Sequence, residues 1–138
     1  MWLSKRRNVP CKFRVSGYAA SPANKVNPKF RCRQHLAADN GDHLHLSESP
    51  DQQKRQEWIA ALDKMESLKP RAVIAGHKRV GNEDSPRIIG ETRKYIRDFE
   101  RLAMQTASAR ELYDEMLKLY PDWINRGALW SSVRAIRT

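Results

Sequence analysis

Three histidines stand where their type and spacing could bind a metal ion. His77 follows a short apolar run in the stretch "RAVIAGHKRVGNEDSP" (71–86). His43 and His45 alternate with leucines in "HLHLS", a pattern that would place both imidazoles on one face of a strand. A catalytic zinc needs three protein ligands and one water, so His77 alone predicts only weak metal binding. The pair His43 and His45 could chelate a metal by chance or be a solvent-facing polar alternation.

The residues that follow His77 admit a functional and a structural interpretation. Lys78 and Arg79 could contact an anionic substrate near a metal, or they could belong to a solvated loop. Glu83 and Asp84 precede Ser85-Pro86, where acidic side chains favour the positive end of the next helix. That account needs no acid–base chemistry. No Ser-His-Asp arrangement, phosphate loop or dinucleotide fingerprint accompanies them, and the sequence identifies no catalytic residue.

The elements that must position these side chains are mostly helical. Two short β-type runs are predicted at 43–47 and 71–76. A helix between them opens at Ser49-Pro50 and ends before Pro70. Three further helices are predicted: one after Ser85-Pro86, one after the S-x-x-E cap at 108–111 and closed by Pro121, and one over 127–136. The fold class is therefore α+β, mostly helical: strand-helix-strand followed by about three helices.

The apolar stripes of these helices are expected to lie in a core or an interface. The second helix carries one such stripe, formed by Ile88, Thr92, Tyr95, Phe99 and Leu102. Trp58, Leu62 and Met65 recur at helical spacing in the first helix. A two-stranded unit is a poor sheet for so many helices. The pattern therefore indicates that a larger sheet is missing and that the uncovered stripes favour self-association.

The positive charge lies at one end of the chain. The net charge is +10, yet residues 1–35 hold nine of the 26 basic residues and none of the 16 acidic ones, which leaves the rest almost neutral. This segment has three prolines and no periodicity, so we expect residues 1–41 to be a basic, disordered or irregular segment and residues 42–138 to form the folded region. The segment could bind nucleic acid weakly and without specificity, or be a solvated tail.

Composition excludes several classes of protein. No run approaches the ~20 apolar residues of a membrane-spanning helix, and the basic N-terminus has no apolar stretch behind it, as a secretory signal would. Cys11 and Cys32 fit neither a zinc-ribbon nor a disulfide framework and are expected to be free thiols. The sequence therefore predicts a cytoplasmic protein with no membrane contact.

A family resemblance follows from the stretch "EWIAALDKMESLKPRAVIAGHKRVGNEDSPRIIGETRKYIRDFERLA" (57–103) and from "ARELYDEMLKLYPDWINRGALWSSVRA" (109–135). Together with "HLHLSES", these stretches resemble the C-terminal part of bacterial metallo-β-lactamase-fold hydrolases, over about residues 42–136. The resemblance implies an αβ/βα sandwich that binds one or two zinc ions. It also implies hydrolysis of an ester, amide, thioester or phosphoester by metal-bound hydroxide. His77 matches the family's final histidine ligand, at the end of a strand.

The chain departs from the family upstream of residue 42. The family's H-x-H-x-D-H motif is absent, and "HLHLSE" (43–48) has only its H-x-H beginning. Asp39 in "LAADNG" could stand for the family's bridging Asp, although it lies two or three positions past the expected place. The resemblance thus implies an incomplete αβ/βα fragment without its N-terminal metal-binding half, in which His77 is the one zinc ligand. Such a chain is expected to be inactive alone and to need ligands from the missing half or from a second copy.

A binding function is the alternative. The chain could be a helical binding or oligomerisation module with a basic arm, whose partner is a second copy or nucleic acid. The sequence discloses no substrate.

Overall fold

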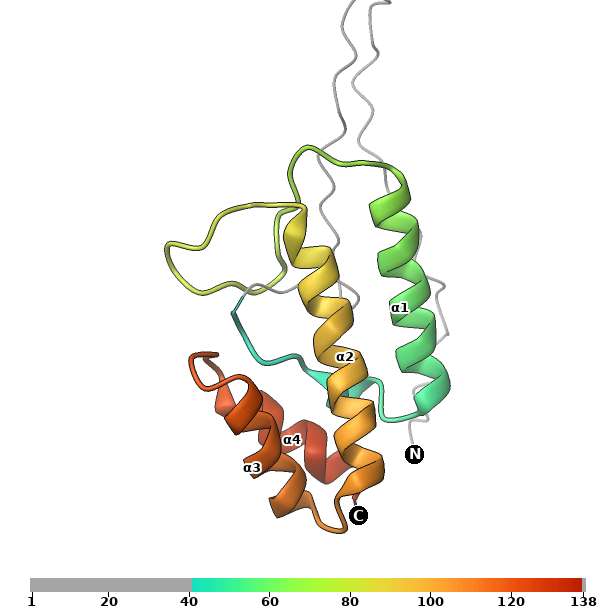
Figure 1. The fold of residues 1–138 in the computed structure, drawn as a ribbon, viewed down its shortest axis with the longest axis vertical. Coiled ribbons are helices and arrows are strands. Elements are labelled where there is room, and N and C mark those ends of the chain that lie inside the picture. The colour runs from blue at the N-terminus through green and yellow to red at the C-terminus, as the bar shows by residue number, and fades with distance from the viewer. Residues whose placement is uncertain (1–40, 138) are drawn as a thin grey trace, which may run out of the picture.

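A computed structural model describes residues 41–137 of the chain, and within them the fold is mostly helical (Figure 1). The elements are the short 3₁₀ helix η1 (Leu46–Glu48) and the α-helices α1 (Gln52–Ser67), α2 (Arg87–Gln105), α3 (Ala109–Leu119) and α4 (Arg126–Ile136). Helix α2 is the centre of the arrangement, since it packs against α1 on one side and α3 on the other. Helix α4 packs against α3 and against η1.

The core confirms the predicted stripe of α2. Its members Ile88, Thr92, Tyr95, Phe99 and Leu102 are all buried. The predicted apolar face of α1 is buried against it, through Trp58, Ile59, Leu62 and Met65. Leu112 and Met116 of α3 and Leu129 and Val133 of α4 complete the same hydrophobic cluster. The helices therefore share one core within the described residues, and burial of this apolar surface is the main term that stabilises them.

The start of α1 lies two residues later than predicted. Its N-cap is Asp51, and no side chain caps the helix. The backbone at Ser49-Pro50 is held instead by the buried side chain of Arg55, whose Nη1 donates to the carbonyls of Ser49 at 3.0 Å and Pro50 at 2.6 Å. The Nε of Arg55 donates to Glu100 on α2 at 3.2 Å. A cationic side chain thus satisfies the carbonyls of this turn, which the sequence pattern could not reveal.

The start of α3 matches the prediction in detail. Ser108 is the N-cap, its hydroxyl accepts the N–H of Glu111, and the Glu111 carboxylate accepts the N–H of Ser108 in return. This is the capping box that the S-x-x-E spacing predicts. At α2 the predicted cap is displaced by one residue, because Pro86 is the N-cap and the Ser85 hydroxyl accepts the N–H of Arg87 at 3.3 Å.

No strand is seen among residues 41–137, whose regular elements are helices. An isolated parallel bridge pairs Asp42 with Ile124, and Val73 and Lys78 also lie in isolated bridges. Residues 43–45 have no regular secondary structure, and Leu46–Glu48 turn into η1. In the stretch 71–76, Val73 is buried while Ile74 lies exposed. Alternation and β-branching favour an extended backbone, yet a strand also needs a neighbour to pair with. The described residues therefore show the mostly helical part of the predicted fold and do not show the strand-helix-strand element.

The segment before η1, residues 41–45, is anchored to the loop before α4. The N–H of His43 donates to the carbonyl of Ile124, and the N–H of Ile124 donates to the carbonyl of Gly41, both at 3.0 Å. Gly41 has a φ of +75°, a region that glycine adopts without steric cost. The Ser132 hydroxyl of α4 donates to the carbonyl of Leu44 at 3.1 Å. These contacts fix the histidines of the segment against α4.

Several expectations fall on residues 1–40 and lie outside the described part of the chain: the irregular basic segment, its nucleic-acid binding and the two free thiols. The domain boundary predicted between residues 41 and 42 stays a prediction. Between residues 41 and 137, no helix is both long and apolar enough to span a membrane.

Candidate functional site

His77 lies on the exposed loop that connects α1 to α2. The loop is closed by the N–H of Val73, which donates to the carbonyl of Asp84, and by Lys78, whose ammonium lies 2.8 Å from the Asp84 carboxylate. Lys78 also donates to the Asn82 carbonyl at 3.4 Å. The charge of Lys78 is therefore paired within its own loop, and a structural role is enough to explain this residue.

The imidazole of His45 lies beside that of His77. The two ring centres are 5.3 Å apart and the ring planes are tilted by 46°. The sequence contains no sign of this contact, because 32 positions separate the two residues. Only the packing of the loop against the segment before η1 brings them together. The prediction that His43 and His45 share a face of a strand is wrong here. His43 is fully buried, whereas His45 is partly exposed.

Asn125 fixes the orientation of the His45 ring. Its side-chain oxygen accepts the N–H of Ala128 at 3.3 Å and so caps α4. Its amide nitrogen lies 3.1 Å from Oδ1 of Asp42 and 3.2 Å from Nε2 of His45. Since the oxygen is committed to Ala128, the amide nitrogen must donate to both neighbours. Nε2 of His45 therefore accepts a hydrogen bond and carries a lone pair.

The backbone conformation at position 125 also accounts for an asparagine there. Its φ is 62° and its ψ is 50°, the left-handed region in which asparagine is one of the few tolerated residues besides glycine. An Asn before a helix start is a sequence signal for such a cap, and the sequence interpretation missed it. The predicted start of this helix at residue 127 lay one residue late, since α4 begins at Arg126.

The family's zinc site requires three protein ligands, and the described residues do not supply them. His77 and His45 come together, but no group of three or more His, Cys, Asp or Glu side chains that could hold a metal lies within residues 41–137. The two imidazoles therefore fit part of a metal site. Two imidazoles are fewer than the three protein ligands of a catalytic zinc, so such a zinc does not fit this part of the chain alone.

His43 has a separate environment in the interior. Its Nδ1 lies 2.8 Å from the Tyr95 hydroxyl, and its ring meets those of Tyr95 and Trp123 at 5.8 and 6.0 Å between centres. Nε2 of His43 is buried and has no hydrogen-bond partner within the described residues. Burial, with a smaller contribution from the charge of Arg126, lowers the pKa of His43 from 6.5 to about 4. The ring is therefore neutral near pH 7 and behaves as a core residue.

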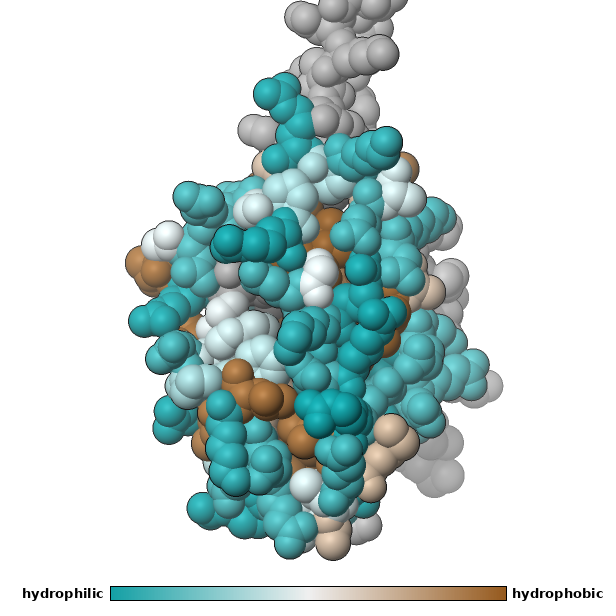
Figure 2. Space-filling view, viewed as in Figure 1, coloured by the Kyte–Doolittle hydropathy of each residue, from teal (hydrophilic) through white to brown (hydrophobic). Residues whose placement is uncertain are grey.

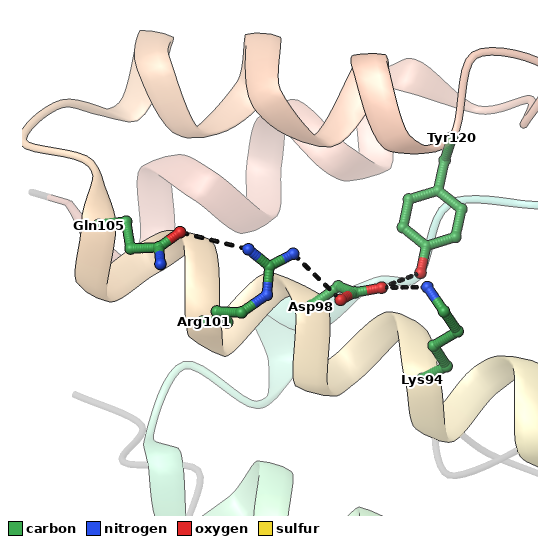
Figure 3. A network of polar contacts seen from close by, with 5 residues as sticks. All are labelled: Lys94, Asp98, Arg101, Gln105 and Tyr120. Carbon is green, nitrogen blue, oxygen red and sulfur yellow. Dashed lines mark hydrogen bonds and ion pairs between the residues drawn. The ribbon is translucent and has the colours of Figure 1, made fainter.

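A polar network joins α2 to the end of α3 (Figure 3). The Asp98 carboxylate accepts from the Tyr120 hydroxyl at 2.7 Å, from Lys94 at 2.6 Å and from Arg101 at 3.2 Å. Burial acts to raise the pKa of Asp98, but these three hydrogen bonds outweigh it and the pKa lies below its usual value. Burial and the bond to Asp98 raise the pKa of Tyr120. Asp98 thus remains ionised and Tyr120 protonated near neutral pH, which indicates a structural role.

A pocket of about 420 Å³ lies beside this network. Its lining combines the cations Arg79 and Lys94 with the acids Glu91 and Asp122 and the ring of Trp123. Charges of both signs line the walls, so the pocket does not select a ligand of one sign. Neither His45 nor His77 lines it.

Comparisons of the chain with protein-family models, with curated proteins and with solved structures find no match.

Proposed function

We propose that residues 42–136 are the C-terminal part of a metallo-β-lactamase-fold hydrolase, and that the chain is catalytically incomplete alone. In this proposal the further zinc ligands come from another polypeptide, either the N-terminal half of such a hydrolase or a second copy. The observation that carries the proposal is the position of His77. It stands at the end of the run 71–76, beside a second imidazole and with no third protein ligand among residues 41–137. A histidine after such an apolar run is in the position of the final ligand that the family resemblance implies.

The first experiment tests whether the chain alone is catalytically inactive. The purified full chain, supplied with zinc, is assayed on a panel of chromogenic esters, lactams, thioesters and phosphoesters. We expect no turnover above that of free zinc, because one or two imidazoles cannot hold zinc and activate its water. A turnover number that is abolished by His77→Ala would contradict the proposal.

The second experiment tests the family. The chain is mixed or coexpressed with the N-terminal half of a metallo-β-lactamase-fold hydrolase. We expect recovered hydrolysis that requires zinc and His77, while His43→Asn leaves it intact because His43 faces the core. A complex that forms and hydrolyses equally well with His77→Ala would overturn the assignment of His77 as a ligand.

Self-association is a second candidate function. Several large apolar side chains are exposed, among them Val80 at 97% and Met104 at 79%. The face in Figure 2 shows separate apolar areas, one of them between α2 and α3, within a hydrophilic surface. Apolar side chains left in water favour association with a partner surface. Light scattering coupled to size-exclusion chromatography tests this idea. We expect a concentration-dependent mass that falls towards 16.0 kDa in Val80→Ser and Met104→Ser, and a monomer at every concentration would exclude it.

A further inference from the structure

We propose that an exposed face of α4 binds single-stranded nucleic acid, with Trp130 stacking on a base and Arg126 and Arg134 contacting the phosphates on either side of it. These three residues, together with Gly127, are called the α4 face below. None of them takes part in the proposed zinc site, so the α4 face does not depend on the hydrolase function.

The spacing of the three side chains places them together. Arg126, Trp130 and Arg134 recur every four residues in α4 and therefore lie on one side of the helix. All three are exposed, Trp130 to 40%. At the rise of an α-helix the two arginines are about 12 Å apart along the axis, with the indole between them. Cations that alternate with an aromatic ring are typical of surfaces that bind single strands.

The charges of the two arginines are not matched by nearby acids. On α2 most basic side chains form ion pairs, as Lys94 and Arg101 do with Asp98. Helix α4, in contrast, contains no acidic residue, and neither Arg126 nor Arg134 forms an ion pair with any side chain of residues 41–137. A phosphate can therefore bind either guanidinium without first breaking an ion pair.

The indole of Trp130 is held in place and has free space beside it. The ring of Tyr113 on α3 meets it edge-on, with ring centres 5.3 Å apart and planes at 85°. Such a contact orders the ring before a ligand arrives, which lowers the entropy cost of binding. A β-carbon at Gly127, one turn earlier, would meet nothing within 4 Å. Because helical side chains lean towards the start of their helix, the indole leans towards this open space. A base has room to stack there.

Other anionic partners fit the α4 face less well. A helix that binds a membrane surface needs a broad exposed apolar face, whereas Trp130 is the one large apolar side chain of α4 that is exposed. An acidic peptide would match the arginines but offers no flat ring to the indole. Residues 1–35, with nine basic residues and no acid, add attraction for a polyanion.

Fluorescence anisotropy of the full chain tests the role of the indole. The probes are a labelled oligothymidylate of about 12 nucleotides and an abasic strand of the same length, which keeps the phosphates and lacks the bases. We expect the parent to prefer the strand with bases, and Trp130→Leu to lower this preference roughly fivefold or more. Binding of the abasic strand should stay nearly unchanged. Gly127→Gln fills the space beside the indole and should lower the preference too.

The salt dependence of binding to the oligothymidylate tests the arginines. Arg126→Gln and Arg134→Gln should each reduce the slope of log affinity against log salt by about 0.7, the value for one phosphate contact to a single strand. Arg97→Gln is the matched control, because Arg97 is an exposed arginine of α2 that forms no ion pair with residues 41–137. This variant should keep the parent's slope.

A measurement without any change in α4 accompanies the variants, whose folding is checked by circular dichroism. In a chain with Trp2→Phe, the oligothymidylate should quench the tryptophan fluorescence more than the abasic strand does. Equal quenching by the two strands would overturn the proposal, as would an unchanged base preference in Trp130→Leu or an equal loss of slope in Arg97→Gln. Tighter binding to anionic vesicles or to polyglutamate, lost in the same α4 variants, would assign the α4 face to that partner instead.

Discussion

Nδ1 of His43 and the hydroxyl of Tyr95 lie 2.8 Å apart in the core, although 52 positions separate the two residues in the sequence. The contact joins the segment before η1, residues 41–45, to the middle of α2. It also places a titratable ring where water does not reach, since neither side chain has any measurable exposure.

Acid should therefore destabilise the fold through His43. Burial lowers its pKa from 6.5 to about 4, so the unfolded chain binds a proton before the native state does. The free energy of unfolding should fall as the pH drops from about 6.5 to about 4, by an amount on the order of 3 kcal/mol. Urea unfolding at a series of pH values measures it. His43→Asn should lack this part of the slope, whereas Tyr95→Phe should retain it. Equal slopes in the parent and in His43→Asn would refute the explanation.

Asn125→Ala should cost about 1–2 kcal/mol. The substitution removes the cap of α4 and places alanine at a φ of 62°, which β-carbon crowding disfavours. Asn125→Gly loses the same hydrogen bonds but tolerates that φ, so it should be the less destabilised of the two variants. Thermal unfolding compares them. Equal melting temperatures would show that backbone conformation contributes nothing at this position.

Gly41→Ala should be destabilised for two reasons that can be separated. Its φ is +75°, and a β-carbon there would lie 2.8 Å from the Asn82 amide nitrogen. The backbone term should cost about 1–2 kcal/mol, whereas the Asn82 side chain can move aside. In a double-mutant cycle with Asn82→Ala, only the contact term should disappear. Full recovery of stability in the double variant would contradict the backbone term.

Tyr120→Phe should cost about 1–2 kcal/mol, because it leaves the Asp98 carboxylate without its most buried donor. Lys94→Met and Arg101→Met remove donors whose side chains are 69% and 47% exposed, and each should cost less than about 1 kcal/mol. The midpoints of denaturant unfolding rank the three variants. A larger loss in either cation variant would show that the ion pairs, not the tyrosine, hold α2 to α3.

The basic segment 1–35 should give the full chain weak, salt-sensitive affinity for labelled nucleic acid. Replacing Lys5, Arg6 and Arg7 with glutamine should lower the slope of log affinity against log salt, because fewer counterions are released. Arg110→Gln on α3 is the matched control for one lost charge and should change nothing. Electrophoretic mobility shifts between low and physiological salt measure the slope. If the labelled nucleic acid does not shift even at low salt, the proposed nucleic-acid binding by residues 1–35 is wrong.

Local signals in the sequence predicted the helices well. The capping box at Ser108 and the stripe of α2 are set by neighbours within about one turn, so the pattern carries them completely. The cap of α1 failed because the side chain of Arg55, which acts from inside the helix, holds the preceding turn.

The site was predicted less well, for a physical reason. His77 could be singled out from the end of an apolar run, but its neighbour His45 depends on how the loop packs, and no local pattern encodes that contact. The two predicted strands, which residues 41–137 do not show, present the same difficulty. Alternation in 43–47 specifies an extended backbone, while pairing is a property of two segments at once.

The bridge between Asp42 and Ile124 has a consequence for synthesis of the protein. The first described segment is completed by the last helix, through the backbone of Ile124 and the hydroxyl of Ser132. A ribosome must therefore release the chain past Ser132 before Leu44 can reach its native neighbours, so nascent chains stalled before residue 124 should remain open to proteolysis.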